Sequence, residues 1–328
     1  MDNGITLDMR QFLVQTSKIK FLFFGGKGGV GKTVMAGATA LHLARQGKRT
    51  LLASTNPVHS LSGLLGRDVF GRITAIPGVP QAFAYEIDTR DTIEKSKKDI
   101  REKINYFLRF ADLQVKAEEF VDAATLNPAF EESAMFENML DLMFGEEFDV
   151  YVFDTAPTAN ARRLLGMSQV YSLWVDKMVK SRSEAQSLRQ LLSFTKKKEE
   201  ADPLMDYLVD FRERMERARL LLTDPALTAF FFVTLPEALP IAVITRFLKW
   251  FQDFGIPVGG IVVNGLLPPA EAGQPAPEFI ENRRTMQGEH LQTIWRLFDG
   301  QVRALVPLFD TEIRGVEPLT RLSDSLFA

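Results

Sequence analysis

Short apolar runs separated by longer stretches of helical periodicity set the pattern of this chain. Most of the runs are continuously apolar instead of alternating, which is typical of strands in a parallel sheet that is covered on both faces. Because helix-forming stretches lie between the runs, the pattern predicts an α/β fold with a doubly wound, mostly parallel sheet. The runs expected to form strands are residues 21–24, 50–54, 82–87, 149–154, 229–235, 260–263 and 302–305.

Two stretches, residues 91 to about 124 and 168 to about 222, have helical character throughout and interrupt this alternation. An apolar stripe with steps of three and four residues follows the second stretch, and it consists of Leu204, Leu208, Phe211, Met215, Ala218 and Leu222. The stripe fits packing of the inserted helices against each other, and it also fits a groove for an apolar client. We therefore expect a helical subdomain of residues 91–130 and 167–222, inserted into a core of residues 1–90, 131–166 and 223–328.

The loop after the first apolar run carries the clearest chemical signature. Residues 26–33 read GKGGVGKT and match G-x-x-x-x-G-K-[ST], between an apolar run and a helical stretch, as a phosphate-binding loop requires. Glycines let backbone N–H groups turn toward phosphate oxygens, and the helix N-terminus adds positive potential. Lys32 is expected to reach the β- and γ-phosphates and Thr33 to bind Mg²⁺, so the core is predicted to be a P-loop NTPase. The residues expected to contact the nucleotide here are Gly26, Gly28, Gly29, Val30, Gly31, Lys32, Thr33 and Val34.

The same glycines also spell G-x-G-x-x-G, which is a dinucleotide-binding fingerprint. That site needs an acidic residue about 20 positions further on, at the end of the next strand. The run 50–54 is followed instead by Thr55 and Asn56, which disfavours a dinucleotide. The run 150–153 ends in Asp154, which suits a strand that holds a Mg²⁺-bound water opposite the phosphate loop. No N-K-x-D motif of guanine-specific GTPases occurs, so ATP and Mg²⁺ are the expected cofactors.

Further motifs carry a resemblance to a known family. Lys27 makes the loop KGGVGKT, which resembles the deviant Walker A loop of dimeric ATPases that include ArsA, MinD, ParA and nitrogenase iron proteins. Residues 55–60 (TNPVHS) resemble the ArsA switch I motif TDPAHS, and residues 154–158 (DTAPT) resemble its switch II motif. Residues 262–264 (VVN) and 307–315 (PLFDTEIRG) resemble its adenine-side segments. The chain is thus similar to the family of arsenite-pump and tail-anchored-protein targeting ATPases, in a single-unit, bacterial-type form.

The resemblance implies roles for individual residues and for the assembly. Lys27 would act across a homodimer on the partner's nucleotide, and Asp154 would hold the Mg²⁺ shell. Asn264 would hydrogen-bond the adenine, and Pro307 would line its pocket. The homodimer would depend on bound nucleotide, and it would serve a hydrophobic protein client or a membrane-protein partner.

The sequence departs from the family motifs in both switches. Asn56 stands where the family has a water-positioning aspartate. An asparagine can orient a water molecule but cannot accept its proton, so slow ATP hydrolysis is expected. Residues 159–161 (ANA) replace the usual G-H-T of switch II, which predicts a different coupling there. Natural divergence and an engineered trap both explain Asn56, and the further changes favour divergence.

The composition removes several kinds of chemistry. The chain has 328 residues, no cysteine and three scattered histidines, His42, His59 and His290. Disulfides, thiolate zinc sites and iron–sulfur clusters are therefore not expected, and neither is arsenite binding through thiolates. A net charge of −3 disfavours a general nucleic-acid binder. No signal peptide and no uninterrupted apolar stretch of about 18 residues is visible, so we expect a soluble, cytoplasmic protein.

The sequence alone is compatible with three functions. The favoured one is a slow, dimeric switch ATPase that couples its nucleotide state to a client or membrane partner. The second is a catalytically impaired, nucleotide-gated binding or chaperone module, which Asn56 favours. The third is a MinD- or ParA-like positioning ATPase, which the C-terminal residues 319–328 disfavour because Arg321 is their only basic residue.

Overall fold

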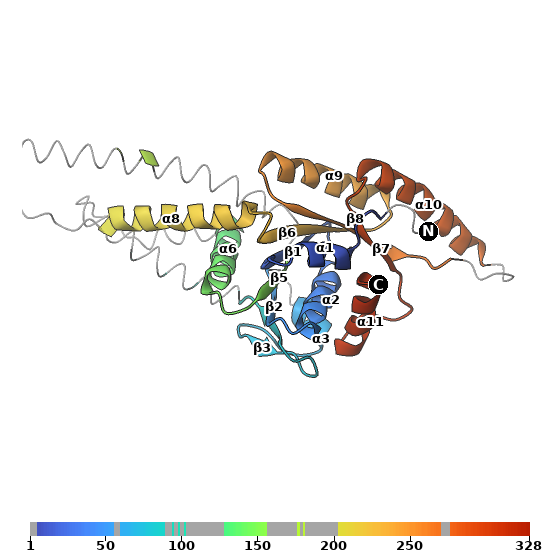
Figure 1. The fold of residues 1–328 in the computed structure, drawn as a ribbon, viewed down its shortest axis with the longest axis horizontal. Helices are drawn as coiled ribbons and strands as arrows, with labels where there is room; N and C mark the ends of the chain where they lie inside the picture. The colour runs from blue at the N-terminus through green and yellow to red at the C-terminus, as the bar shows by residue number, and fades with distance from the viewer. Residues whose placement is uncertain are drawn as a thin grey trace, which may run out of the picture. The chain divides into compact units, whose positions relative to one another are not determined.

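The computed structural model describes residues 5–55, 60–88, 128–155, 203–269 and 276–328, together with the single positions 94, 98, 102, 176, 177 and 180. Helices and strands alternate along most of these residues (Figure 1). The strands are β1 (Phe21–Gly25), β2 (Thr50–Ser54), β3 (Thr74–Ala75), β4 (Ala82–Glu86), β5 (Val150–Asp154), β6 (Thr228–Thr234), β7 (Val258–Leu266) and β8 (Val302–Pro307). The helices are α1 (Met9–Gln15), α2 (Lys32–Arg45), α3 (Ser60–Leu65), α6 (Pro128–Gly145), α8 (Pro203–Thr223), α9 (Ala238–Asp253), α10 (Glu278–Leu297) and α11 (Val316–Leu326).

Within the described residues the strands form one eight-stranded sheet in the order β3-β4-β2-β5-β1-β6-β7-β8. All neighbouring strands are parallel except β3, which pairs antiparallel with β4. The prediction of a doubly wound, mostly parallel α/β sheet is confirmed, and each of the seven expected runs forms a strand. The two-residue strand β3 was not expected, because one half-buried and one exposed residue leave no apolar pattern to read.

Helices cover both faces of the sheet, which explains why its strands are continuously apolar. Side chains of alternate residues point to opposite faces. Leu22, Phe24 and Phe231 belong to the buried cluster that includes the inner faces of α2 and α11. Figure 1 shows α2 and α11 on one side of the sheet and α9 and α10 on the other.

A row of aromatic rings joins the three central strands on the α9 side. Phe23 of β1 stacks between Phe153 of β5, at 4.8 Å between ring centroids, and Phe230 of β6, at 4.3 Å. Phe251 of α9 packs edge-on against Phe230 and Phe232, at 4.9 Å from each. Such ring pairs add about 0.5–1.5 kcal/mol each beyond the burial of their area. The row therefore fixes β5, β1 and β6 relative to one another, just before the strands reach their carboxyl ends.

The strand order creates a topological switch point at the carboxyl end of β1. After β1 the chain crosses to β2 on one side, and the later strands β6, β7 and β8 continue on the other side. In open α/β sheets, ligands bind outside the carboxyl ends of the strands at such a switch point. The loop that follows β1 is thus where the fold places a ligand.

The chain divides into two compact units. The first comprises residues 1–88, 138–160 and 222–328, and the second comprises residues 89–137 and 161–221. Most residues of the expected helical subdomain lie outside the described part of the chain, so its domain boundaries stay a prediction. In the described part of α8, Met215, Ala218 and Leu222 of the expected apolar stripe are buried. Among the described helices, none combines the length and the apolar character needed to cross a bilayer.

Candidate functional site

The loop between β1 and α2 needs glycine at several of its positions. Gly26, Gly29 and Gly31 have φ angles of 149°, 81° and 96°, in the region that side chains with a Cβ rarely adopt. A Cβ on Gly26 would clash with the carbonyl oxygen of Val233 in β6, and one on Gly31 would clash with the side-chain amide of Asn264. The backbone of the loop therefore lies directly against the ends of β6 and β7.

Gly28 differs from these three glycines because its φ lies outside the positive region. A Cβ at Gly28 would also meet no atom of the described residues within 4 Å. Its small size is therefore not required by packing inside the protein. An open, Cβ-free surface on this loop fits the close approach of a phosphate group to backbone N–H groups.

Lys32 begins α2 and lies almost wholly buried, with 7% of its surface exposed. Its Nζ donates to the backbone carbonyl of Lys27 at 3.2 Å, so the cation lies within the curve of the loop. Burial lowers the pKa of Lys32, and the negative charge of Asp154 opposes this shift. The side chain of Lys32 thereby contacts the backbone of Lys27, and Lys27 itself is half-exposed. Val30 is buried and Val34 is half-buried beside them.

Asp154, at the end of β5, faces the first turn of α2. The hydroxyl of Thr33 donates to Asp154 Oδ2 at 2.7 Å, and the hydroxyl of Ser54 lies 3.5 Å from the same atom. Asp154 is fully buried. Burial raises its pKa to about 6, against the lowering effects of Thr33, Lys32 and Ser54, and Glu86 adds to the rise. The carboxylate is therefore costly to keep ionised without a further positive charge nearby.

The residues around Asp154 fit a Mg²⁺ ion. Asp154 Oδ1 is buried and has no hydrogen-bond partner among the described residues. Mg²⁺ prefers hard oxygen ligands, keeps several waters and binds through one or two protein groups plus substrate phosphates. The Thr33 hydroxyl and the Asp154 carboxylate supply such oxygens. Among the described residues there is no cluster of three or more His, Cys, Asp or Glu that could hold a metal ion by itself.

Asn264 lies near the end of β7 and contacts the phosphate loop. Its Nδ2 donates to the carbonyl of Val30 at 2.9 Å, and its Oδ1 accepts from the N–H of Gly265 at 2.8 Å. The side chain thus ties β7 to the loop, and its expected hydrogen bond to adenine stays a prediction. Pro307, expected to line the adenine pocket, is the exposed last residue of β8.

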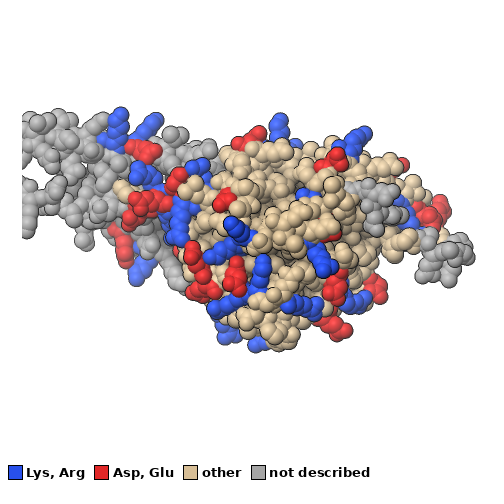
Figure 2. Space-filling model, in the orientation of Figure 1, with Lys and Arg blue, Asp and Glu red and all other residues tan. Residues whose placement is uncertain are grey.

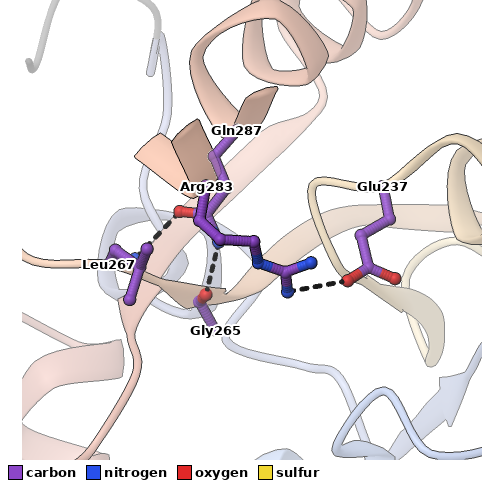
Figure 3. Close-up of polar contacts among 5 residues, drawn as sticks. All are labelled: Glu237, Gly265, Leu267, Arg283 and Gln287. Atoms are coloured by element: carbon purple, nitrogen blue, oxygen red, sulfur yellow. Dashed lines mark hydrogen bonds and ion pairs between the residues drawn. The ribbon is translucent and has the colours of Figure 1, made fainter. Parts of the chain in front are cut away.

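A buried glutamine behind this segment was not found by sequence reasoning. Gln287 of α10, with 7% of its surface exposed, accepts from the N–H of Leu267 at 2.9 Å and donates to the carbonyl of Gly265 at 3.0 Å (Figure 3). One turn earlier on the same helix, Arg283 pairs with Glu237 at 3.4 Å. These contacts fix the backbone that follows Asn264. A single glutamine in a polar helix gives no sequence signal, because only the fold brings it to the end of β7.

A second residue missed by sequence reasoning is Glu86, at the end of β4. It is buried, and its carboxylate accepts hydrogen bonds from Leu61 and Ser62 in the first turn of α3. The pattern of the run 82–87 predicted a strand, but it gave no reason to assign chemistry to its acidic residue. The predicted switch residue Asn56 and most of the switch II motif, residues 156–158, lie outside the described residues.

Comparisons with known proteins agree with this arrangement. The family model described as anion-transporting ATPase (ArsA_ATPase) matches residues 19–328. A Halobacterium salinarum protein, provisionally named an arsenical pump-driving ATPase, is 34% identical over 94% of this chain and 44% of its own length. The ATPase GET3B of Arabidopsis thaliana is 31% identical over 96% of this chain and 80% of its own length. The ATPase ASNA1 homolog 1 of Paramecium tetraurelia is 28% identical over 96% and 94% of the two chains.

The chain spans less than half of the Halobacterium relative but most of the other two. The family match covers the phosphate loop, the strand that carries Asp154 and the segment around Asn264. The chain therefore belongs to the ArsA ATPase family.

Proposed function

We propose that this protein binds ATP with Mg²⁺ at the loop of residues 26–34 and hydrolyses it slowly. The observation that carries the proposal is the contact between Thr33 and the buried carboxylate of Asp154, behind a glycine loop that holds Lys32. Family membership and three relatives named as ATPases support it. A bound Mg²⁺ supplies positive charge that stabilises the charge developing on the phosphate oxygens.

The residues of the chain then have distinct tasks. The N–H groups of the loop and the N-terminus of α2 bind phosphate oxygens. Lys32 exchanges its hydrogen bond to the Lys27 carbonyl for one to a phosphate oxygen. The new charge-assisted hydrogen bond offsets the free-energy cost of burying the Lys32 charge. Thr33 and Asp154, whose side chains now hydrogen-bond to each other, would hold the Mg²⁺ and its shell when the ion is bound. Pro307 lines the adenine pocket.

The expected slow rate comes from the sequence of switch I. Asn56 orients the attacking water but does not take its proton, because an amide is not a base at neutral pH. Phosphoryl transfer relies mainly on positioning and on stabilising charge, so hydrolysis is slowed and not abolished. A second candidate function, a nucleotide-gated binding module without turnover, is favoured by the same residue. A single-turnover assay separates the two, because only the first releases phosphate.

We also propose a nucleotide-dependent homodimer in which Lys27 reaches the partner's nucleotide. The half-exposed position of Lys27 on the loop supports this role. Sedimentation with and without ATP and Mg²⁺ tests it. The expected result is a shift from monomer to dimer with nucleotide, and a monomer under both conditions would contradict it.

The partner is proposed to be a hydrophobic protein client or a membrane protein, and not nucleic acid. On the face shown in Figure 2, the described basic and acidic side chains are interspersed instead of gathered into a basic patch. A positioning ATPase would need an exposed amphipathic helix, whereas Leu319, Leu322 and Leu326 of α11 are buried. Arsenite pumping is not carried over from the Halobacterium relative, because a chain without cysteine offers no thiolates.

The decisive test of ATP use compares two lysine variants. Lys32→Ala removes the buried cation of the loop, whereas Lys18→Ala removes an exposed lysine elsewhere. We expect Lys32→Ala to lose ATP binding, measured by titration calorimetry with Mg²⁺, and to release no phosphate. Lys18→Ala should behave like the parent. Equal ATP binding by both variants and the parent would overturn the proposed function.

A further inference from the structure

Glu86 is a buried carboxylate whose observed hydrogen bonds hold the start of one helix. It ends β4, and 1% of its surface is exposed. Its Oε1 accepts from the N–H of Leu61 at 2.9 Å, and its Oε2 accepts from the N–H of Ser62 at 3.3 Å and from the Ser62 hydroxyl at 2.6 Å. A carboxylate is costly to bury unless such bonds compensate for lost water. The first turn of α3 is thus fastened to the end of β4.

The sheet register places this carboxylate close to the candidate Mg²⁺ site. Glu86 pairs with Ser54 across β4 and β2, and Ser54 pairs with Asp154 across β2 and β5. The three residues therefore form a row at the carboxyl edge of the sheet, about 5 Å from strand to strand. The row is close enough for the charge of Glu86 to act on Asp154.

The first residue of switch I (residues 55–60) and the two residues that follow it, Leu61 and Ser62, are attached to this row. On the near side, the N–H of Thr55 donates to the carbonyl of Asp154 at 3.0 Å. On the far side, Leu61 and Ser62 are attached to Glu86. The strand ends that hold both sides are themselves joined, because the N–H of Ile87 donates to the carbonyl of Ser54 at 3.3 Å. The distance between the start of α3 and Asp154 is thus set through Glu86.

We propose that Glu86 is a positioning residue of the nucleotide site, one that fixes the first turn of α3 relative to Asp154. This inference rests on the proposed ATPase function. The role needs no contact of Glu86 with nucleotide or metal, because its carboxylate is engaged by Leu61 and Ser62. It acts through the helix start that it holds, so it sets the rate of hydrolysis and leaves ATP affinity nearly unchanged.

The test uses Glu86→Gln, with Glu289→Gln as the matched control on the exposed side of α10. The amide keeps the size of the side chain, but its nitrogen cannot accept the hydrogen bonds that reach one carboxylate oxygen. We expect kcat for ATP to fall about tenfold while KM changes less than about twofold. Hydrogen exchange at the Leu61 and Ser62 amides of the nucleotide-free protein should speed up about tenfold or more, with no change at Met35 in α2.

Two milder variants keep the inference testable if Glu86→Gln does not fold. Ser62→Ala removes the shortest of the three hydrogen bonds and should give a smaller change in the same direction. Glu86→Asp keeps the charge and should recover part of both kcat and amide protection. Faster exchange at Leu61 and Ser62 with an unchanged kcat would overturn the inference, and so would unchanged exchange in Glu86→Gln.

The exchange measurement also separates this inference from the proposed function. A parent protein that releases no phosphate would defeat the ATPase proposal and, with it, the catalytic part of this role. Hydrogen exchange at the Leu61 and Ser62 amides would still show whether Glu86 holds the start of α3. A parent that hydrolyses ATP, together with a Glu86→Gln variant of equal kcat, would defeat the positioning role alone.

Discussion

The hydroxyl of Thr33 donates to Asp154 Oδ2 across 2.7 Å and joins the first turn of α2 to the end of β5. The two residues are 121 positions apart in the chain, so only the parallel pairing of β1 with β5 brings them together. The contact occupies one carboxylate oxygen and leaves Oδ1 buried without a partner among the described residues. Lys32 and two hydroxyl groups therefore compensate the buried carboxylate only in part, as its raised pKa shows.

Asp154→Asn should stabilise the nucleotide-free protein at neutral pH. Burial raises the pKa of Asp154 from 3.8 to about 6, so between these values the folded protein binds the proton more tightly than the unfolded chain. The free energy of unfolding therefore falls as the pH rises through this window, by about 3 kcal/mol in total from this residue. Urea unfolding measured from pH 4 to 7.5 should show that the free energy of unfolding of the variant rises relative to that of the parent, up to about pH 6.5.

The exposed Asp253→Asn is the control for this comparison. It removes the same charge from the end of α9 and should follow the parent across the whole pH range. A stability difference between Asp154→Asn and the parent that does not change with pH would contradict the assigned pKa shift.

Asn56→Asp should accelerate ATP hydrolysis. The substitution restores a carboxylate that can take the proton of the attacking water, and a positioned general base contributes about 10²-fold or more. Phosphate release from both forms, measured with saturating ATP and Mg²⁺, checks this expectation. Asn282→Asp on the exposed side of α10 is the matched change at a remote position. Rapid phosphate release by the parent protein, or an equal rate in Asn56→Asp, would contradict this interpretation of Asn56.

The sheet was predictable because β1, β2, β5 and β6 are buried on both faces and the other long strands still carry short apolar runs. The apolar run 150–153 within the expected strand 149–154 indicates a strand without any knowledge of its neighbours. The strand order and the two-residue β3 were not predictable, because pairing depends on contacts between distant segments. Bounds were also inexact: β7 extends beyond the run 260–263 and takes in Asn264, a polar residue at which the apolar pattern stops.

The candidate site was predictable where its chemistry is local in sequence. The glycines and Lys32 lie within one loop, and Asp154 follows an apolar strand. Glu86 and Gln287 were missed because each acts on backbone groups of a segment about 20 to 25 residues away, which only the fold brings near. For Asn264, the motif suggested adenine, whereas the structure shows a hydrogen bond to the phosphate loop.

Gly31→Ala should destabilise the protein, whereas Gly28→Ala should leave its stability almost unchanged. Gly31 has a φ of 96°, and its Cβ would clash with Asn264, so alanine there should destabilise the fold by at least about 1–2 kcal/mol. Gly28 faces open space, so alanine there should change stability by less than about 0.5 kcal/mol. It should still weaken ATP binding, because a methyl group obstructs the phosphate. Thermal unfolding without nucleotide and an ATP titration check both points; equal melting temperatures would contradict the loop geometry.

Asn264→Ala should weaken ATP binding about tenfold. Comparing this loss with the loss of affinity for GTP shows whether Asn264 contacts the adenine. The substitution removes the hydrogen bond to the Val30 carbonyl and leaves that acceptor without its partner, at a cost of about 1–2 kcal/mol. If Asn264 only shapes the phosphate loop, the affinities for ATP and GTP fall by the same factor. If it also contacts adenine, the preference of the parent for ATP is lost in the variant. Asn282→Ala, on the exposed side of α10, is the control and should change neither affinity. Parent-like binding of both nucleotides by Asn264→Ala would show that neither role holds.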